Sequence, residues 1–172
     1  MDEPSIPVFP PVIRVSSQGP YASIGGWLIL VAIGLTLFIV RGIFEILLNF
    51  VPLMTSPEWS LMTSPDSRQY QPYLWTIVIA ELLANISLIA FAAVSLKFML
   101  NRSKRFPKMQ ITLLLANLAF LLVDLWLARK VSGASDAITL ESIREVSMSF
   151  VAATIWVPYF LMSKRVKETF VK

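Results

Sequence analysis

The sequence predicts an all-α, polytopic membrane protein, a bundle of four transmembrane helices joined by short loops. Its 172 residues are 56% hydrophobic and only 15% charged, whereas soluble domains average about 45–50% apolar and about 25% charged residues. The apolar residues gather in four runs, each long enough to cross about 30 Å of hydrocarbon at about 1.5 Å per helical residue. These runs take up most of the chain, so we expect no separate soluble domain.

The chain contains neither cysteine nor histidine, which excludes disulfides, thiolate chemistry and zinc or haem sites built on those residues. It also lacks a phosphate-binding glycine loop, an HExxH motif and a nucleophile elbow. We therefore expect no catalytic residues, no cofactor and no metal. The net charge of +4 comes from basic residues beside the apolar runs, which favours contacts with lipid over nucleic acid.

The chain divides into three regions. Residues 1–22 are expected to form a proline-rich cytoplasmic arm, 23–163 the transmembrane domain and 164–172 a basic cytoplasmic tail. The four spans are predicted at about 25–51, 73–100, 107–130 and 146–162. The arm lacks the basic start and compact apolar core of a secretory signal, so we expect it to stay on the protein.

Boundary signals support spans one and two. Gly25-Gly26-Trp27 opens span one, and Pro52 is expected to close it. Pro72 is expected at the first helical position of span two, where its missing N–H is not needed, and Asn101 is the expected end. The loop between them holds a tandem octad at 53–68. We interpret it as a duplication in a tolerant loop, in preference to a binding repeat.

Spans three and four carry similar signals. Pro107 begins span three, and Gly133 lies just beyond its end. Ser142 and Glu145 have the spacing of a capping box, which would satisfy free backbone donors ahead of span four. Pro158 is expected to kink the last turns of that span.

The distribution of basic residues predicts the orientation, because Lys and Arg concentrate on the cytoplasmic side. Ten of the 15 Lys and Arg residues fall in the arm, in the second loop with its flank, and in the tail. Only four fall in the connections on the opposite side, and Arg41 lies within a span. Four spans put both termini on one side, so we expect both to be cytoplasmic.

Four ionisable residues lie inside the apolar runs: Arg41, Glu45, Glu81 and Asp124. A charge at mid-bilayer costs roughly 2.5–3.5 kcal/mol on insertion scales, so each of them needs a physical reason. The helical rise places all four about 6–12 Å from the midplane, in the outer half of the bilayer. We predict one polar cluster there. Any proton chemistry would fall to its carboxyls, because desolvation favours their neutral form.

Helical phase predicts a polar seam that supports this cluster. Its members are Asn85, four residues after Glu81, together with Gln110 and Asn117, which precede Asp124 at intervals of seven. Ser147 and Thr154 form a weaker stripe on span four. Stripes of this kind are costly against lipid, so we expect them to face one another. We expect the seam residues mainly to form hydrogen bonds between helices. For the four ionisable residues of the cluster, we regard a functional and a structural role as equally probable.

Three segments of the chain resemble one bacterial family. They are Ile24-Gly-Gly-Trp with the residues up to Leu35, Arg105-Phe-Pro-Lys108, and Ile155-Trp-Val-Pro-Tyr with the residues up to Phe170. They are similar to the domain-of-unknown-function 2569 family of small four-helix inner-membrane proteins. The resemblance covers about 25–170 and implies a multi-pass protein of a bacterial inner membrane. It implies no activity and no catalytic residues.

Three function hypotheses follow. The first is a non-enzymatic protein that binds a membrane-protein partner, a lipid or its own copies through the bundle. The second is a small transport or proton-coupled unit built around Arg41, Glu81 and Asp124. It would need an oligomer, because four spans are few for a monomeric carrier. A membrane enzyme is the least favoured, since no catalytic constellation is visible.

Overall fold

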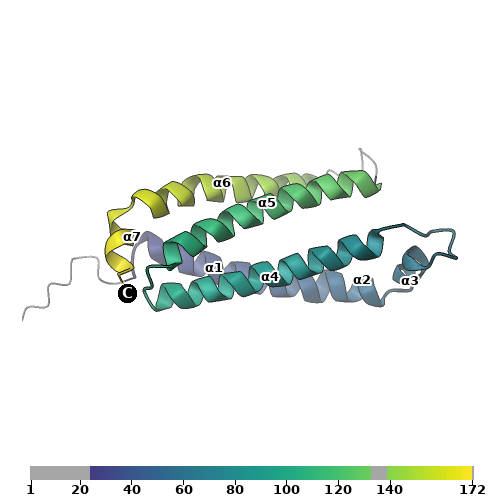
Figure 1. Ribbon diagram of the computed structural model, residues 1–172, viewed down its shortest axis with the longest axis horizontal. Helices are drawn as coiled ribbons and strands as arrows, with labels where there is room; N and C mark the ends of the chain where they lie inside the picture. Colours follow the sequence, from purple (N-terminus) through teal and green to yellow (C-terminus); the bar gives the residue numbers. More distant parts are fainter. Residues whose placement is uncertain (1–23, 133–138, 172) are drawn as a thin grey trace, which may run out of the picture.

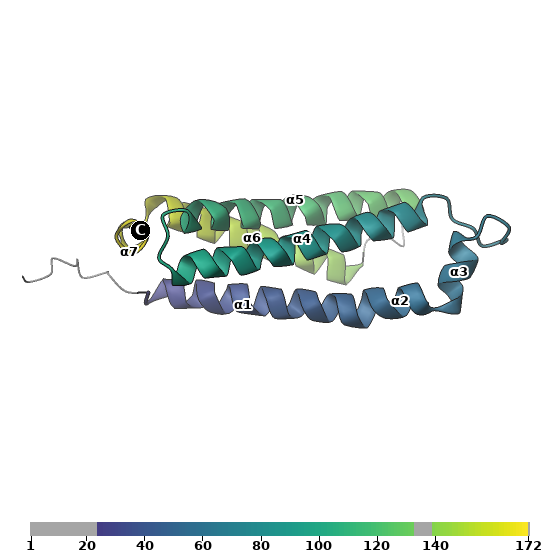
Figure 2. The ribbon, with the colours of Figure 1, turned by 60° about the horizontal axis from the view of Figure 1, so that its bottom comes forward.

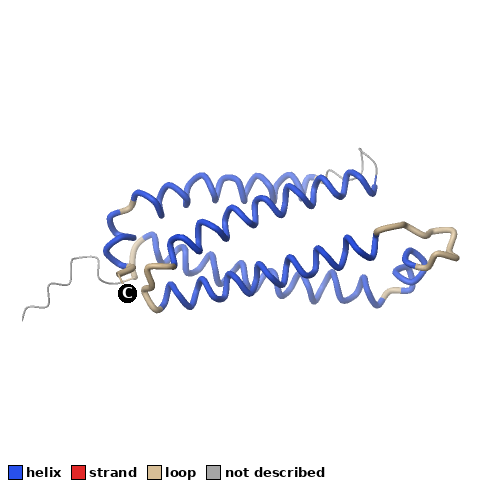
Figure 3. The backbone as a smooth tube through the Cα atoms, viewed as in Figure 1, coloured by secondary structure: helices blue, strands red, loops and turns tan. Residues whose placement is uncertain are grey.

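The computed structural model describes residues 24–132 and 139–171, and in these ranges every regular element is a helix. Four helical stretches are long and apolar enough to cross a membrane: Trp27–Thr55, Leu74–Leu100, Phe106–Arg129 and Leu140–Met162. They lie side by side along one axis (Figures 1 and 3). The predicted all-α fold with four membrane-length helices is therefore confirmed. The predicted arm at 1–22 lies outside the described residues.

The first long helix continues past the proline that was expected to close it. It comprises α1 (Trp27–Glu45), a π-helical segment η1 (Ile46–Phe50) and α2 (Val51–Thr55). The Val51 N–H donates to the Ile46 carbonyl, five residues back, so α-helical pairing has already been interrupted when the chain reaches Pro52. Pro52 then occupies the first turn of α2. The prediction that it ends span one is wrong, because proline is tolerated where its N–H would have had no α-helical partner.

The connection after α2 contains a short helix, α3 (Pro57–Thr63). Ser56 caps it: the backbone of Ser56 is extended, and its Oγ accepts a hydrogen bond from the Trp59 N–H at 3.1 Å. Ser64, the equivalent serine in the second octad, ends the same helix. The two copies of the repeat therefore fold differently, since one Ser-Pro pair starts a helix and the other follows it.

α4 (Leu74–Leu100) and α5 (Phe106–Ser132) are joined by a short turn. α4 begins after Tyr73, whose backbone is left-handed with φ 74°. That conformation interrupts the helical path, so Pro72 lies in the preceding turn and the expectation that it is the first helical residue is wrong. Asn101 does end α4, and its N–H donates to the Lys97 carbonyl at 3.1 Å.

α6 (Leu140–Met162) starts one and a half turns earlier than the sequence predicts. Thr139 caps it. The Thr139 Oγ1 accepts from the Ser142 N–H, and the Ser142 Oγ accepts from the Thr139 N–H, each at 3.1 Å. The capping box expected between Ser142 and Glu145 is therefore wrong, because Thr139 supplies the cap at the previous turn. Glu145 is consequently free to face the inside of the bundle.

The long helices pack mainly in chain order: α1 on α4, α4 on α5 and α5 on α6 (Figure 2). No comparable backbone packing joins α1 to α6 in the described ranges. Side chains bridge these two helices instead. At one end the rings of Trp27 and Trp156 meet edge to face, with their centroids 6.3 Å apart. The α1–α6 side is therefore the loosest seam of the bundle.

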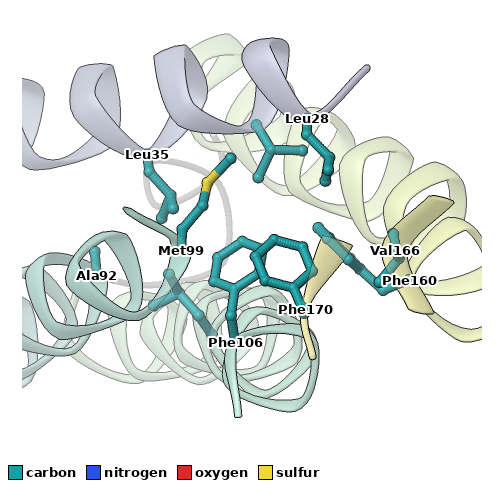
Figure 4. Close-up of a cluster of buried hydrophobic side chains, with 10 residues drawn as sticks. Leu28, Leu35, Ala92, Met99, Phe106, Phe160, Val166 and Phe170 are labelled. Carbon is teal, nitrogen blue, oxygen red and sulfur yellow. The ribbon is translucent and has the colours of Figure 1, made fainter. Parts of the chain in front are cut away.

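The hydrophobic core lies at the end of the bundle where α1 begins and α7 (Lys164–Thr169) folds back (Figures 1 and 4). Val166 and Phe170, four residues apart on one face, are buried there, and the ring centroids of Phe106 and Phe170 are 4.6 Å apart. In the region expected to be a basic tail, residues 164–169 thus form a helix that closes this end of the bundle.

Candidate functional site

A cavity of about 320 Å³ lies among the four long helices, toward the end opposite the core. The four ionisable residues predicted as a cluster, Arg41, Glu45, Glu81 and Asp124, all line this cavity. Arg41 and Glu45 come from α1, Glu81 from α4 and Asp124 from α5. Three separate helices therefore bring these side chains to one place, at matching positions along the bundle axis. We call this space the polar cavity.

Arg41 forms an ion pair with Glu145 of α6, and this pair bridges the loose α1–α6 seam. The sequence reasoning missed Glu145, because it assigned that residue to a capping box. A usable signal was present: Glu145, Ser149 and Trp156 are spaced by four and seven residues on one face of α6. All three line cavities in the bundle.

The stripe expected on span four is wrong, because it was assigned to the opposite face of the helix. Ser147 and Thr154 are both exposed, and neither lines the polar cavity. The Thr154 hydroxyl donates to the Phe150 carbonyl of its own helix at 2.9 Å. Glu145 and Ser149, and not Ser147 and Thr154, are the polar residues of α6 that line the polar cavity.

The remaining carboxyls have few partners within the protein. Glu45, the last residue of α1, accepts a hydrogen bond from the Nδ2 of Asn49 in η1, at 2.6 Å. The side chains of Glu81 and Asp124 have no hydrogen bond or ion pair to any other residue in 24–132 and 139–171. Both are half-buried; Glu81 is within electrostatic range of Asp124 and Glu45, and Asp124 is within range of Glu145. Within the described part of the chain, neither group has a cationic partner.

The predicted seam residues are distributed between the polar cavity and the helix contacts. Asn117 Nδ2 donates to the Ser149 Oγ at 3.0 Å and so links α5 to α6. Buried Gln110 accepts from the Ser95 Oγ at 3.0 Å and links α5 to α4, away from the polar cavity. Asn85 lines the polar cavity and donates to the Glu81 carbonyl of its own helix at 3.2 Å. Gln110 and Asn117 thus hydrogen-bond between helices, whereas Asn85 does not.

A second cavity of about 220 Å³ adjoins the first on the α1–α6 side. We call it the apolar cavity. Its lining is mostly hydrophobic, and it shares Phe38, Asn117 and Ser149 with the polar cavity. Gly34 lies on its wall, and a Cβ added there would meet no atom within 4 Å. The two cavities therefore run together along α1, and the apolar one has unfilled space beside Gly34.

The chemistry of the polar cavity is that of an acidic site. One guanidinium faces four carboxyl groups, and Glu145 already neutralises Arg41. Within the described ranges no group of three or more His, Cys, Asp or Glu side chains is placed to hold a metal ion. The arrangement can accept hydrogen bonds from a cationic or otherwise donor-rich group at Glu45, Glu81 and Asp124.

Comparison with known proteins bears on the whole bundle. A family model described as "Protein of unknown function (DUF2569)" matches residues 21–171. This match spans every described element and confirms the resemblance predicted from the sequence. No curated protein and no solved structure shows a significant match to the chain.

Proposed function

Because the chain belongs to the DUF2569 family, whose description assigns no function, we propose a function from the cavity: non-enzymatic binding of a lipid, a membrane-protein partner or a second copy of the chain. The observation that carries this proposal is the polar cavity of about 320 Å³, in which Glu81 and Asp124 have no cationic partner among the described residues. This volume is at the lower end of the range for small-molecule pockets, about 300–1,000 Å³.

The free-energy cost of placing carboxyls inside a membrane favours a binding role for them. An ionisable side chain inside a membrane costs free energy. Even a buried charge pair can often be replaced by apolar residues of similar size with no loss of stability, so such charges are weak evidence for a purely structural role. Interhelical hydrogen bonds such as Asn117–Ser149 already hold helices together at roughly 0.6 kcal/mol each. Glu81 and Asp124 make no such bond to the described residues. A ligand that supplies the missing donors gives these two side chains a role that helix packing does not.

Co-purification from native membranes tests the proposal. Wild-type protein extracted in mild detergent is expected to carry an enriched lipid or protein, identified by mass spectrometry. The Glu81→Gln/Asp124→Asn double variant keeps the shape of both side chains and removes their charge. It should lose at least tenfold of that enrichment, while Glu141→Gln, an exposed site at the start of α6, should retain it.

Two outcomes would count against binding through this cavity. Either nothing is enriched with the wild-type protein, or the double variant retains the same molecule to the same extent. The two proteins must show the same thermal unfolding midpoint and the same elution volume, so that a loss of binding is not a loss of fold.

A small transport or proton-coupled unit is the alternative, favoured by the same intramembrane carboxyls. The two functions differ in flux. Reconstituted in liposomes that contain a pH-sensitive dye, a proton-coupled unit would acidify the lumen after a pH step, and the Glu81→Gln/Asp124→Asn variant would not. Our proposal expects wild-type and variant liposomes to acidify at the rate of protein-free liposomes.

We also propose that the protein is a multi-pass protein of a bacterial inner membrane with both termini in the cytoplasm. The distribution of Lys and Arg supports this orientation. The fold agrees with both termini on one side of the membrane, because the start of α1 and α7 lie at the same end of the bundle (Figure 1). In this orientation the polar cavity belongs to the outer half of the membrane.

Reporter fusions provide the topology prediction. A cytoplasm-active reporter fused after Lys172 should be active, and a periplasm-active reporter at the same position should be silent. The same pair of reporters inserted after Ser67, in the turn that follows α3, should give the reverse pattern. A periplasmic signal at Lys172 would invert the assignment of both membrane faces.

A further inference from the structure

The two cavities differ in chemistry and yet adjoin each other. The polar cavity presents carboxyls from three helices, and the apolar cavity presents mostly hydrophobic side chains of α1, α5 and α6. Phe38 belongs to both, and it lies on α1 between Gly34 on the apolar side and Arg41 on the polar side. A molecule that occupied both spaces would therefore have one polar end and one apolar end.

The charge of the polar cavity selects the sign of the polar end. Glu45, Glu81 and Asp124 have no cationic partner in the described ranges, whereas the only arginine of the cavity is already paired with Glu145. An ammonium group is a compact donor that can face several carboxyls at once. A bare metal ion fits less well, because no group of acids in the described chain is close enough to hold one.

The apolar cavity lies at the α1–α6 seam. These two helices lack the backbone packing of the other neighbours, and Trp27–Trp156 and Arg41–Glu145 bridge them at separate levels. The apolar cavity lies between those levels, lined by Leu30, Gly34 and Ala152. Many residues on the outside of the bundle are large, exposed hydrophobics, so the seam borders the lipid.

We propose that the polar and apolar cavities form one site for a single-chain amphiphilic amine, with its ammonium among Glu45, Glu81 and Asp124 and its alkyl chain beside Gly34. This inference rests on the proposed function and names the ligand class for the same site. The charge of the head complements the carboxyls that have no cationic partner in the described ranges, and the mostly hydrophobic lining of the apolar cavity, about 220 Å³ in volume, suits an alkyl chain. In this pose the ammonium lies nearer the outer membrane surface than the alkyl chain. An amphiphile in the outer leaflet has the same orientation.

Binding of dodecylamine tests the pose. The full-length protein is reconstituted in phosphatidylcholine nanodiscs, and saturable binding is measured against empty nanodiscs by isothermal titration. Dodecylamine should bind saturably. Butylamine, which has the head alone, dodecanol, which has the tail alone, and dodecyl sulfate, which has the opposite charge, should each bind at least tenfold more weakly.

Matched variants locate the site. Glu81→Gln/Asp124→Asn should weaken dodecylamine at least tenfold by removing charge. Gly34→Leu should do so by filling the apolar cavity, and open space at Gly34 lets the new side chain fit. Glu141→Gln and Ala90→Leu, at exposed positions outside both cavities, should bind like wild type.

The outcomes separate this inference from the proposed function. Equal dodecylamine binding by Gly34→Leu and wild type, or equal binding of dodecanol and dodecylamine, would overturn the amphiphilic-amine site. If native membranes still yield a ligand that depends on Glu81 and Asp124, the proposed function stands and only the ligand class is wrong. If neither ligand nor dodecylamine binding depends on those residues, both proposals fail.

Discussion

Gly34 and Gly42 lie two turns apart on α1, and their surroundings are opposite. A Cβ at Gly34 would point into open space, whereas one at Gly42 would lie 2.7 Å from the Ile89 Cγ1 of α4. Gly34 therefore leaves a space unfilled, and Gly42 permits close approach of two helices, a common use of small residues between membrane helices. The sequence alone does not distinguish them, because both are glycines inside one apolar run.

Substitution by alanine should separate the two glycines. Gly34→Ala should raise the free energy of unfolding by about 0.5–1 kcal/mol, because alanine is the better helix former and meets no obstacle. Gly42→Ala should lower it by about 1–2 kcal/mol, because Ile89 must move. Denaturant unfolding in detergent micelles, followed by circular dichroism, measures both. Equal effects of the two substitutions would contradict the packing described for α1 and α4.

Among the elements, α6 shows how a shift of helix start changes the interior of the bundle. The Thr139–Ser142 capping box starts the helix at Leu140. Since the cap does not use Glu145, that side chain can turn inward to Arg41. Both boxes have the same spacing of three residues, so the sequence pattern does not choose between them. The structure shows the Thr139–Ser142 box, with its two hydrogen bonds of 3.1 Å.

Removal of the cap tests this assignment. Thr139→Ala should lower the free energy of unfolding by about 0.5–2 kcal/mol, because the Ser142 N–H loses the Thr139 Oγ1 as its hydrogen-bond acceptor. Ser147→Ala, on the exposed face of the same helix, should change it by less than about 0.5 kcal/mol. If Thr139→Ala were as mild as the control, the start of α6 would have to be placed elsewhere.

A second element, α7, carries more of the core than its length suggests. Phe170, just beyond its last residue, is buried against Phe106. Phe170→Ala should cost about 3–5 kcal/mol of unfolding free energy. Val171→Ala, at an exposed neighbour, serves as the control and should have little effect. A mild Phe170→Ala, measured in the same detergent unfolding assay, would mean that α7 does not close the bundle.

At the scale of the whole molecule, hydropathy and helical rise predict the four long helices and the convergence of Arg41, Glu45, Glu81 and Asp124. Both depend on properties local to one helix, namely apolar length and position along its axis. Features that depend on a partner element are the ones the sequence missed. To predict the inward position of Glu145, one must know where α6 starts. To predict that the helix continues past Pro52, one must know that a π-helical turn precedes it.

The contrast between the two ends of the bundle is also a property of the whole molecule. One end is filled by aromatic side chains and closed by α7, and the other contains the polar cavity. The similar depth predicted for the four ionisable residues anticipates that they meet at one end of the bundle, where the polar cavity lies. The closed end could not be anticipated, because 164–172 is mostly polar, and the buried residues Val166, Thr169 and Phe170 include only two hydrophobic ones.

The Gly25–Gly26 pair has a consequence for the order in which the molecule assembles. The guanidinium of Arg165 lies against both glycines, so that a Cβ at Gly25 would approach its Nη2 to 2.6 Å, and Gly26 has a φ of 57°. The contact joins the first described turn of the chain to its last helix. During synthesis α7 emerges only after all four spans have been made, and contacts between distant parts of a chain form slowly. The end of the bundle that α7 closes can therefore form only after α7 has been synthesised, whereas the polar cavity can form before it.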